Sequence, residues 1–481
     1  MSVPPYQGDD IPRNEIKSVD ASRDELSVDS DAARLAEMGY TQEMERGFSK
    51  WTLLGVSFAL TNSWFGISAS LVTGISSGGP IVTVYGIVII AIINGCVAVS
   101  LSELVSAMPN SGGQYFWASE LSPKKYANFL AYTTGAIGYA GSLFTCASVA
   151  LAIGSALMGM IQLNHPNLVI ERWMLLPIRF SCVHDHHYHH SACNIFPETK
   201  CQIRVCKLCQ QYWMGIKRDR LHFPRPERNI PFAIMGTVAI GFFTAFIYSI
   251  SMFFSMNNLD ELVFSSTLVP ILELYYQATG SKAGATFLEF MICFTGLGCQ
   301  IACHTWQARL CWSFARDRGL PGSHLWSQVH PKMGIPFYAH SMSCFVVALL
   351  GLLYIGSTTA FNSMVTACIV LLYISYAVPI TLLLIKGRNN IKHGPFWLGG
   401  FGLAANIVTL IWTLFTLIMY SFPYGKPVTA GSMNYVSAVY AVVFVLVFGY
   451  WFLRGHRTFR SKDERVVEAE HLTNHIPQAS N

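Results

Sequence analysis

The spacing of charged residues limits what this chain can fold into more than any other feature of its sequence. No Asp, Glu, Lys or Arg occurs between Lys50 and Glu103, and further long uncharged runs follow. A helix that crosses the hydrocarbon core of a membrane needs about 20 mostly apolar residues and tolerates almost no ions. Only 12% of the 481 residues are charged, against about 25% in soluble proteins. The sequence therefore predicts a multi-pass membrane protein.

The uncharged runs define the predicted spans once the two longest are divided at turn-like breaks, residues 76–80 and 356–359. The nine predicted spans lie near residues 51–75, 81–105, 127–160, 232–256, 283–308, 339–356, 360–385, 396–421 and 433–453. We therefore expect an all-α membrane protein. Residues 1–50 are too polar to bury a core and are predicted to form a disordered cytoplasmic tail. Residues 456–481 form a second predicted cytoplasmic tail.

The basic residues predict the orientation of the spans, because Lys and Arg near span ends stay in the cytoplasm. By this rule the third span begins inside at Lys125 and ends outside near Met160. The next span begins beside Arg225 and Arg228, which is again inside. An odd number of crossings must lie between, yet residues 161–230 contain no adequate apolar stretch. The charge pattern thus predicts that crossings are missing from the middle of the chain.

The same interval has an abrupt change in composition, with cysteine and histidine in the strings "CVHDHHYHH" and "CQIRVCKLC". One interpretation is a zinc site, because Cys201, Cys206, Cys209 and a nearby His could supply tetrahedral ligands. The spacing is irregular and lacks a second ligand pair. We therefore favour the other interpretation, out-of-frame or unspliced sequence translated where spans should be, and we expect no resident metal or cofactor.

Three motifs carry a resemblance to a known family: "NSWFGISASLVTGISSGGP" from Asn62, "SLSELVSAMPNSGGQYFWASELSPKKY" from Ser100, and "CHTWQARLCWSFARDRGLP" from Cys303. They resemble fungal permeases of the amino acid, polyamine and organocation superfamily, and within it the choline transporter group, with the GABA permease group close behind. "PRPERNIPFAIMGTVAIGFFTAFIYSISMFFS" from Pro224 and "HGPFWLGGFG" from His393 extend the resemblance.

The resemblance implies a secondary transporter of twelve spans, ten of them in two inverted five-helix repeats, with substrate held where the first and sixth helices unwind. In this twelve-span arrangement, residues 51–173 contain spans one to three and residues 224–455 contain spans seven to twelve. Residues 174–223 replace spans four to six. The resemblance also implies uptake of choline or a similar nitrogenous solute, coupled to protons, across the fungal plasma membrane.

The first span contains the predicted substrate site, because a helix break there exposes backbone groups to a ligand. The candidate residues are Asn62, Ser63, Trp64, Phe65, Gly66 and Ile67. Choline has a permanent positive charge surrounded by methyl groups, which aromatic faces can bind. Trp64 and Phe65, with Tyr139 and Phe144 of the third span, are predicted to form such a cage. The alternative is that small residues serve a close helix crossing and that the aromatic rings only pack.

Six further residues are candidates for gating or coupling, because ions within a membrane are costly and usually functional. Glu103 is expected to stabilise the inner gate by pairing with a base. For Glu289 we expect that it reaches the outer interface, with proton coupling as the alternative. The other four lie in the "CHTWQARLCWSFARDRGLP" motif: His304 and Trp306 as lining of an exit path, and Arg316 and Asp317 as a latch.

Other function classes find no support in the sequence. It contains no nucleotide-binding loop, nucleophile elbow or paired carboxylates, so an enzyme or an ATP-driven pump is not expected. The net charge of +5 is explained by basic span ends and requires no nucleic acid. Two alternatives to a choline transporter stay open: an amino acid or GABA permease, and the non-functional product of a faulty gene model.

Overall fold

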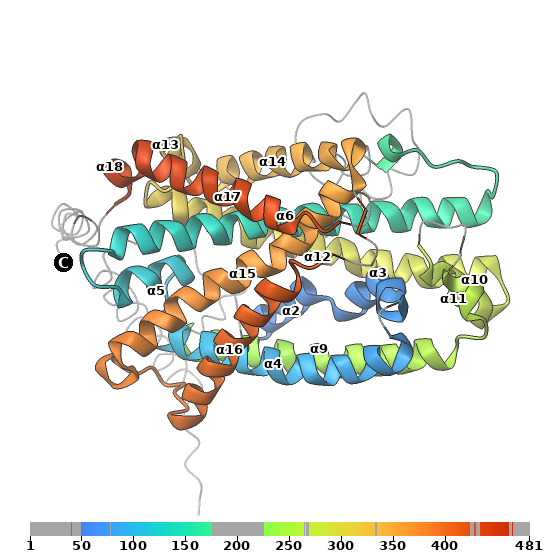
Figure 1. Ribbon diagram of the computed structural model, residues 1–481, viewed down its shortest axis with the longest axis horizontal. Coiled ribbons are helices and arrows are strands. Elements are labelled where there is room, and N and C mark those ends of the chain that lie inside the picture. Colours follow the sequence, from blue (N-terminus) through green and yellow to red (C-terminus); the bar gives the residue numbers. More distant parts are fainter. Residues whose placement is uncertain are drawn as a thin grey trace, which may run out of the picture.

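Long helices that run side by side dominate the computed structural model of the chain (Figure 1). The structure describes residues 40, 50–76, 78–175, 226–263, 265, 269–331, 334–423, 428–429, 433–460 and 464. Every secondary-structure element within these residues is helical. The all-α prediction is therefore confirmed. Most of the Cys/His-rich segment, including the candidate zinc ligands Cys201, Cys206 and Cys209, lies outside the described residues.

Eight of the helices are long and apolar enough to cross a membrane. They are α4 (Gly79–Ala107), α6 (Ala127–Asn164), α9 (Pro226–Phe254), α12 (Lys282–Arg316), α14 (Phe337–Gly356), α15 (Thr358–Lys386), α16 (Gly400–Met419) and α17 (Val436–Tyr450) with its continuation to Thr458. Each falls on one of the predicted spans. The remaining predicted span, near residues 51–75, is two shorter helices, α2 (Lys50–Thr61) and α3 (Ser63–Ser76), which meet at Asn62.

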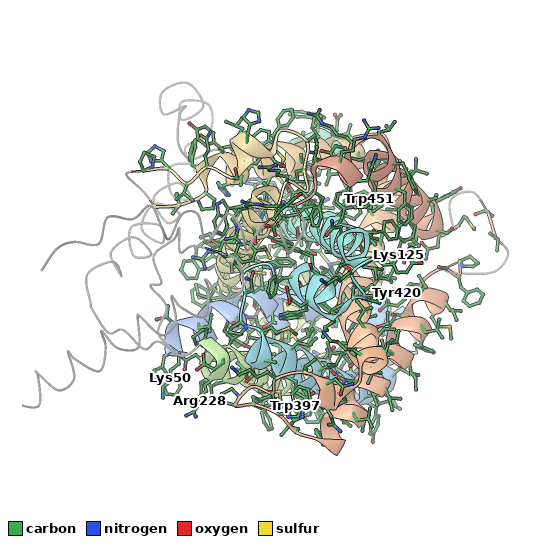
Figure 2. The ribbon with its side chains drawn as sticks, turned by 90° about the vertical axis from the view of Figure 1, so that its left-hand side faces the viewer. Lys50, Lys125, Arg228, Trp397, Tyr420 and Trp451 are labelled. Carbon is green, nitrogen blue, oxygen red and sulfur yellow. The ribbon has the colours of Figure 1, made fainter. Side chains whose placement is uncertain are left out.

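Short helices gather at the two ends of the bundle (Figure 1). One end holds α5 (Gln114–Leu121), α13 (Ser323–Trp326) and α18 (His456–Thr458), and the other holds α10 (Leu259–Val263) and α11 (Ile271–Thr279). The first end is the one that the basic residues assign to the cytoplasm. Figure 2 looks onto it and shows Lys50, Lys125 and Arg228.

The direction of the helices agrees with the orientation predicted from charge. Helix α6 ends beside α10 and α11, at the outer end, whereas α9 begins at the cytoplasmic end (Figure 1). The described segments on either side of residues 176–225 thus lie at opposite ends of the bundle, as the charge pattern predicted.

Packing between the spans relies on small residues, while large apolar side chains cover the outside. A Cβ added at Gly135 of α6 would meet the ring of Phe314 of α12 at 2.6 Å, so only glycine allows this approach. Side chains such as Ile81, Phe243 and Leu446 are more than half exposed, as expected where lipid replaces water. Small residues at helix contacts and apolar residues outside are the pattern of a membrane bundle.

Candidate functional site

The break in the first span lies at Asn62, between α2 and α3. Asn62 has φ +32°, a left-handed backbone conformation that asparagine tolerates better than most residues. The backbone N–H of Asn62 still donates to Phe58 O at 2.9 Å, and the backbone carbonyl of Asn62 accepts from Gly66 N at 3.1 Å. The carbonyl of Leu60 faces α12, where it lies 3.3 Å from Cys299 Sγ. The break is where the first-span motif predicted it.

Polar atoms at this break have no partner within the described chain. Asn62 is only 3% exposed, yet neither atom of its side-chain amide forms a hydrogen bond with a described residue. The same holds for the indole Nε1 of Trp64. Buried polar groups are nearly always paired, because leaving one unpaired costs about 1–3 kcal/mol. The break therefore presents two donors and an acceptor suited to a small polar ligand.

The other residues of the predicted first-span site face different neighbours. The Phe65 ring packs over Gly296 of α12, where an added Cβ would meet it at 2.8 Å. The Trp64 ring meets Phe58 edge to face, with centroids 5.8 Å apart. Ser63 Oγ lies beside Gly241 of α9, and Gly66 and Ile67 are not buried. Trp64 and Phe65 thus lie on different sides of the helix.

The third-span aromatics lie in a core cluster. Tyr139 Oη is 3.2 Å from Ser343 Oγ of α14, and its ring packs among buried side chains of α6, α12 and α14. Phe144 packs against the edge of the same cluster, as does Leu60 of α2. Among the described residues, no ring pair joins Tyr139 or Phe144 to Trp64 or Phe65. The four-ring cage therefore stays a prediction. Of its four rings, only that of Trp64 has a polar atom at the break without a partner among the described residues.

A chain of hydroxyl groups leads from the break toward the outer end of the bundle. Ser68 of α3 donates to Trp64 O at 2.9 Å and lies 2.6 Å from Tyr248 Oη of α9. Tyr248 Oη lies 2.6 Å from Tyr275 Oη of α11. The carboxyl group of Glu289 in α12 interacts electrostatically with both tyrosines. Three helices thus contribute hydroxyl groups to one polar path, and Glu289 of a fourth helix lies near its outer end.

The expectation that Glu289 reaches the outer interface is wrong. Glu289 is 1% exposed, and its Oε2 forms no hydrogen bond with the described residues. Helices α10 and α11 cover the outer end of α12 with a buried cluster that includes Leu262, Leu272 and Tyr275. The hydroxyl path was not predicted from the sequence, although a serine and two tyrosines in apolar surroundings are a signal that could have indicated it.

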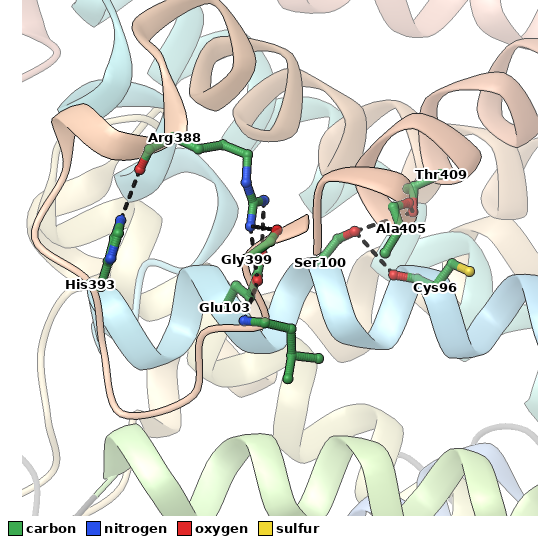
Figure 3. A network of polar contacts seen from close by, with 9 residues as sticks. Cys96, Ser100, Glu103, Arg388, His393, Gly399, Ala405 and Thr409 are labelled. Carbon is green, nitrogen blue, oxygen red and sulfur yellow. Dashed lines mark hydrogen bonds and ion pairs between the residues drawn. The ribbon is translucent and has the colours of Figure 1, made fainter. Parts of the chain in front are cut away.

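Glu103 at the cytoplasmic end of α4 pairs with a base, as expected, and the base is Arg388 (Figure 3). Arg388 Nη1 and Nη2 donate to the two carboxylate oxygens of Glu103 at 2.8 and 3.0 Å. Leu398 N donates to Glu103 Oε1 at 2.9 Å, and Arg388 Nη2 also donates to Gly399 O at 3.1 Å. The fully buried carboxylate is therefore held by a two-pronged ion pair and a backbone amide.

The "HGPFWLGGFG" motif wraps around this pair. The rings of His393 and Trp397 stack at 4.1 Å, and the Arg388 guanidinium lies 4.5 Å from the Trp397 ring centroid. His393 Nε2 lies 3.0 Å from Arg388 O, a bond drawn in Figure 3. A Cβ at Gly402 would collide with the Glu103 carboxylate. The motif thus fastens the loop after α15 to the inner end of α4.

A second inner contact joins Asp317 to the N-terminal segment. Tyr40 Oη donates to Asp317 Oδ2 at 2.7 Å, and both residues are buried. The Arg316 guanidinium lies 4.0 Å from the Tyr40 ring centroid and 4.7 Å from that of Trp312. Tyr40 itself is 3% exposed, while the rest of the predicted tail before Lys50 lies outside the described residues, so the tail stays a prediction.

His304 and Trp306 lie on different faces of α12. His304 is buried against α14, where its Nδ1 is 3.8 Å from Cys344 Sγ. Trp306 lines a small recess between α5, α6, α12 and α15, together with Gln114 and Tyr376. The structure thus does not bring the two residues together in one path.

Comparison with known proteins adds the decisive observation. The amino acid permease family matches residues 48–187 and 221–447, which is most of the chain. The chain belongs to the amino acid permease family. The choline transporter of Saccharomyces cerevisiae is 44% identical over 90% of this chain and 86% of its own length. The 7-keto 8-aminopelargonic acid transporter of the same yeast is 28% identical over 90% of this chain and 96% of its own. The swainsonine transporter swnT of Arthroderma benhamiae is 30% identical over 89% of this chain and 93% of its own length.

The permease match is interrupted over the Cys/His-rich segment, between residues 187 and 221. The alignment with the yeast choline transporter is 484 positions long. It nevertheless includes only 90% of the 481 residues of this chain, so it is longer than the part of this chain that it covers. The yeast protein therefore has residues without a counterpart here. A multi-pass membrane location follows from the family and from the eight apolar helices.

Proposed function

We propose that this permease moves choline, or a similarly small nitrogenous cation, across the membrane by alternating access at the Asn62 break. The observation that carries the proposal is the buried break itself, where the side-chain amide of Asn62 and the indole N–H of Trp64 have no partner among the described residues. The 44% identity to a yeast choline transporter supports the choice of substrate. We also propose the plasma membrane as its location, because uptake of a solute from outside the cell takes place there.

The chemistry of choline fits these groups. Its quaternary nitrogen cannot donate a hydrogen bond, so a ring face is the suitable partner for the cation, worth about 0.5–2 kcal/mol when desolvated. Its single hydroxyl group can pair with an amide such as that of Asn62. An amino acid would in addition bring a carboxylate, for which a free helix N-terminus such as that of α3 would be needed.

Proton coupling is the second part of the proposal, and it is assigned to Glu289. A carboxyl group within a membrane bundle is costly when ionised and is characteristic of proton pathways. Glu289 is buried at the outer side, and the hydroxyl groups of Tyr275, Tyr248 and Ser68 connect its surroundings to the Trp64 carbonyl. Proton uptake at Glu289 would thus affect the break through this path of hydrogen-bonded hydroxyl groups.

Uptake of labelled choline into yeast cells that lack their own choline transporter tests the proposal. For a chain in which the missing crossings are restored, we expect saturable uptake that excess unlabelled choline abolishes and excess GABA does not. Transport of GABA that excess choline leaves untouched would instead identify an amino acid or GABA permease. Surface expression of the tagged protein is measured in the same cells, so that a lack of uptake is interpreted only for protein that reaches the membrane.

The middle of the chain is a separate proposal. Residues 174–223 stand in place of three crossings, supported by the direction of α6 and α9, the interrupted family match and the unmatched residues of the yeast relative. Sequencing of the transcript across Trp173 to Pro224 tests this. A reading frame that restores three apolar spans would show that the native permease is longer, whereas confirmation of "CVHDHHYHH" would give a chain that we expect to be inactive in uptake.

A further inference from the structure

Two histidines and a cysteine meet where α12 packs against α14. His304 of α12 and Cys344 of α14 are buried, at 5% and 2% exposure, and His340 of α14 is half-buried. One nitrogen from each imidazole and the Cys344 sulfur all lie within 4.8 Å of one another. Cys344 Sγ is 3.5 Å from His340 Nε2 and 3.8 Å from His304 Nδ1. The cluster lies on α12 between the Asn62 break and the cytoplasmic end.

The two sulfur–nitrogen separations are close to the edges of a metal coordination tetrahedron, and the two imidazole nitrogens lie within 4.8 Å of each other. Zinc binds sulfur at about 2.3 Å and imidazole nitrogen at about 2.0–2.1 Å, which places neighbouring ligand atoms roughly 3.3–3.6 Å apart. The observed sulfur–nitrogen distances require shifts of only a few tenths of an ångström. A thiol has one hydrogen and can donate to only one of the two imidazoles at a time. A metal ion would bind all three groups at once.

His340 and Cys344 are four residues apart on one helix, so they lie on the same face and hold two ligands in fixed register. His304 comes from a neighbouring helix and closes the site. The rings of His304 and His340 are edge to face with centroids 5.7 Å apart, which lets a nitrogen of each point to a common centre.

Gln300 contacts the ring nitrogen of His304 that does not face Cys344. Metal-bound histidines donate their other ring N–H to an acceptor that fixes their orientation. The Gln300 amide, one helical turn before His304, lies 2.8 Å from His304 Nε2. Rotation of this amide by half a turn presents its oxygen to the ring. Gln300 is itself buried, and its Oε1 has no other hydrogen-bond partner among the described residues.

We propose that His304, His340 and Cys344 form a site for a divalent metal ion of the zinc class, with a fourth position open to water or another ligand. The mixed thiolate and imidazole set favours zinc over magnesium or calcium, which take oxygen ligands. A bound ion fastens the inner part of α12 to α14. This assignment replaces the exit-path role predicted for His304 and revises the expectation that the chain holds no metal.

Zinc binding to the full-length purified protein in detergent tests the site. The Cys/His-rich segment could itself bind zinc, so the reference protein has the segment's five cysteines, Cys182, Cys193, Cys201, Cys206 and Cys209, replaced by serine and its six histidines replaced by glutamine. We expect it to bind one zinc ion per chain. His304→Gln, His340→Gln and Cys344→Ser made in that background should each weaken binding by more than about 100-fold, since even loss of an outer-shell partner costs about 10- to 100-fold. Gln300→Leu should fall within that smaller range.

The absorption spectrum of bound cobalt(II) tests the site in the reference protein itself, so it does not depend on whether the ligand variants fold. Cobalt(II) in the reference protein should show the intense thiolate charge-transfer band and the d–d bands of a tetrahedral site, and zinc should displace both. Cys96→Ser in α4 and His165→Gln are matched controls that remove a thiol and an imidazole elsewhere and should leave binding unchanged. Absence of the thiolate band, or zinc binding that persists in all three ligand variants, would overturn the proposal.

Discussion

Arg388 donates two hydrogen bonds to the buried carboxylate of Glu103, across 285 residues of sequence. The pair joins the loop after α15 to the inner end of α4, and the stacked rings of His393 and Trp397 cover it. Because the Glu103 side chain is fully buried, the carboxylate depends on this guanidinium, its one ion-pair partner within the part of the chain that the structure describes, for a compensating charge.

Arg388→Ala should therefore destabilise the protein strongly. Removing one partner of a buried ion pair leaves an uncompensated charge and costs about 3–5 kcal/mol. The measurement is the thermal unfolding midpoint in detergent, with Arg454→Ala, an exposed arginine at the same end, as the matched control. Adding Glu103→Gln to Arg388→Ala should recover part of the loss. An Arg388→Ala protein that melts with the wild type would contradict the assignment.

Tyr40→Phe should loosen the N-terminal segment from the inner end of the bundle. The substitution removes only the hydroxyl group that donates to Asp317, and a hydrogen bond to a charged group is worth about 1.5–3 kcal/mol. We expect a lower melting temperature and faster proteolytic cleavage before residue 50. Tyr126→Phe, which alters a half-exposed tyrosine ring, is the control and should change neither. Equal cleavage rates in all three proteins would show that Tyr40 does not anchor the segment.

The order and position of the helices could be predicted from charge alone, because hydrocarbon excludes ions whatever the details of packing. Eight of the nine spans predicted from the apolar runs are single long helices, the first is divided into α2 and α3, and Lys50, Lys125 and Arg228 gave the orientation. The break at Asn62 was expected only through the resemblance to known permeases. Nothing in the local pattern distinguishes it from a continuous helix, since the stretches on both sides are equally apolar.

Side-chain partners could not be predicted, because they depend on contacts distant in sequence. Glu103 required a base, but its choice of Arg388 depends on how residues 388–399 fold back over α4. Glu289 was placed at the outer interface because it is near the beginning of its span. The cluster formed by α10 and α11 covers that position, and no periodicity in the sequence indicates where two short helices will pack.

Asn62→Gly and Asn62→Val should separate the backbone role of Asn62 from its binding role. Glycine adopts φ +32° without strain, so that variant should fold normally but lose the side-chain amide. We expect its KM for choline to rise about 5- to 10-fold, since one hydrogen bond is worth about 1–1.5 kcal/mol. Valine is β-branched and should in addition destabilise the break. Thr61→Val, at the preceding exposed position, is the control. A glycine variant with an unchanged KM would remove Asn62 from the site.

Trp64→Leu should distinguish a cation site from an apolar pocket. Leucine keeps an apolar surface but has no ring face, so the variant should lose affinity for choline by about 2- to 30-fold, equivalent to 0.5–2 kcal/mol. Competition by 3,3-dimethylbutanol, the uncharged isostere of choline, should change little. Phe144→Leu is an informative comparison, because its ring packs against a core cluster. Equal losses for both competitors in Trp64→Leu would show that the ring contributes only apolar contact.

Glu289→Gln should uncouple transport from protons without abolishing substrate binding. Glutamine has nearly the same shape but cannot take up or release a proton, so an imposed inward proton gradient should no longer drive accumulation of choline in proteoliposomes. Exchange of labelled for unlabelled choline, which needs no net proton movement, should persist. Tyr248→Phe breaks the hydroxyl path and should slow accumulation more than exchange. Glu261→Gln alters an exposed carboxylate at the same outer end and should leave both activities intact. Gradient-driven accumulation by Glu289→Gln at the wild-type level would exclude this carboxyl group as the coupling site, because the glutamine amide cannot take up or release a proton.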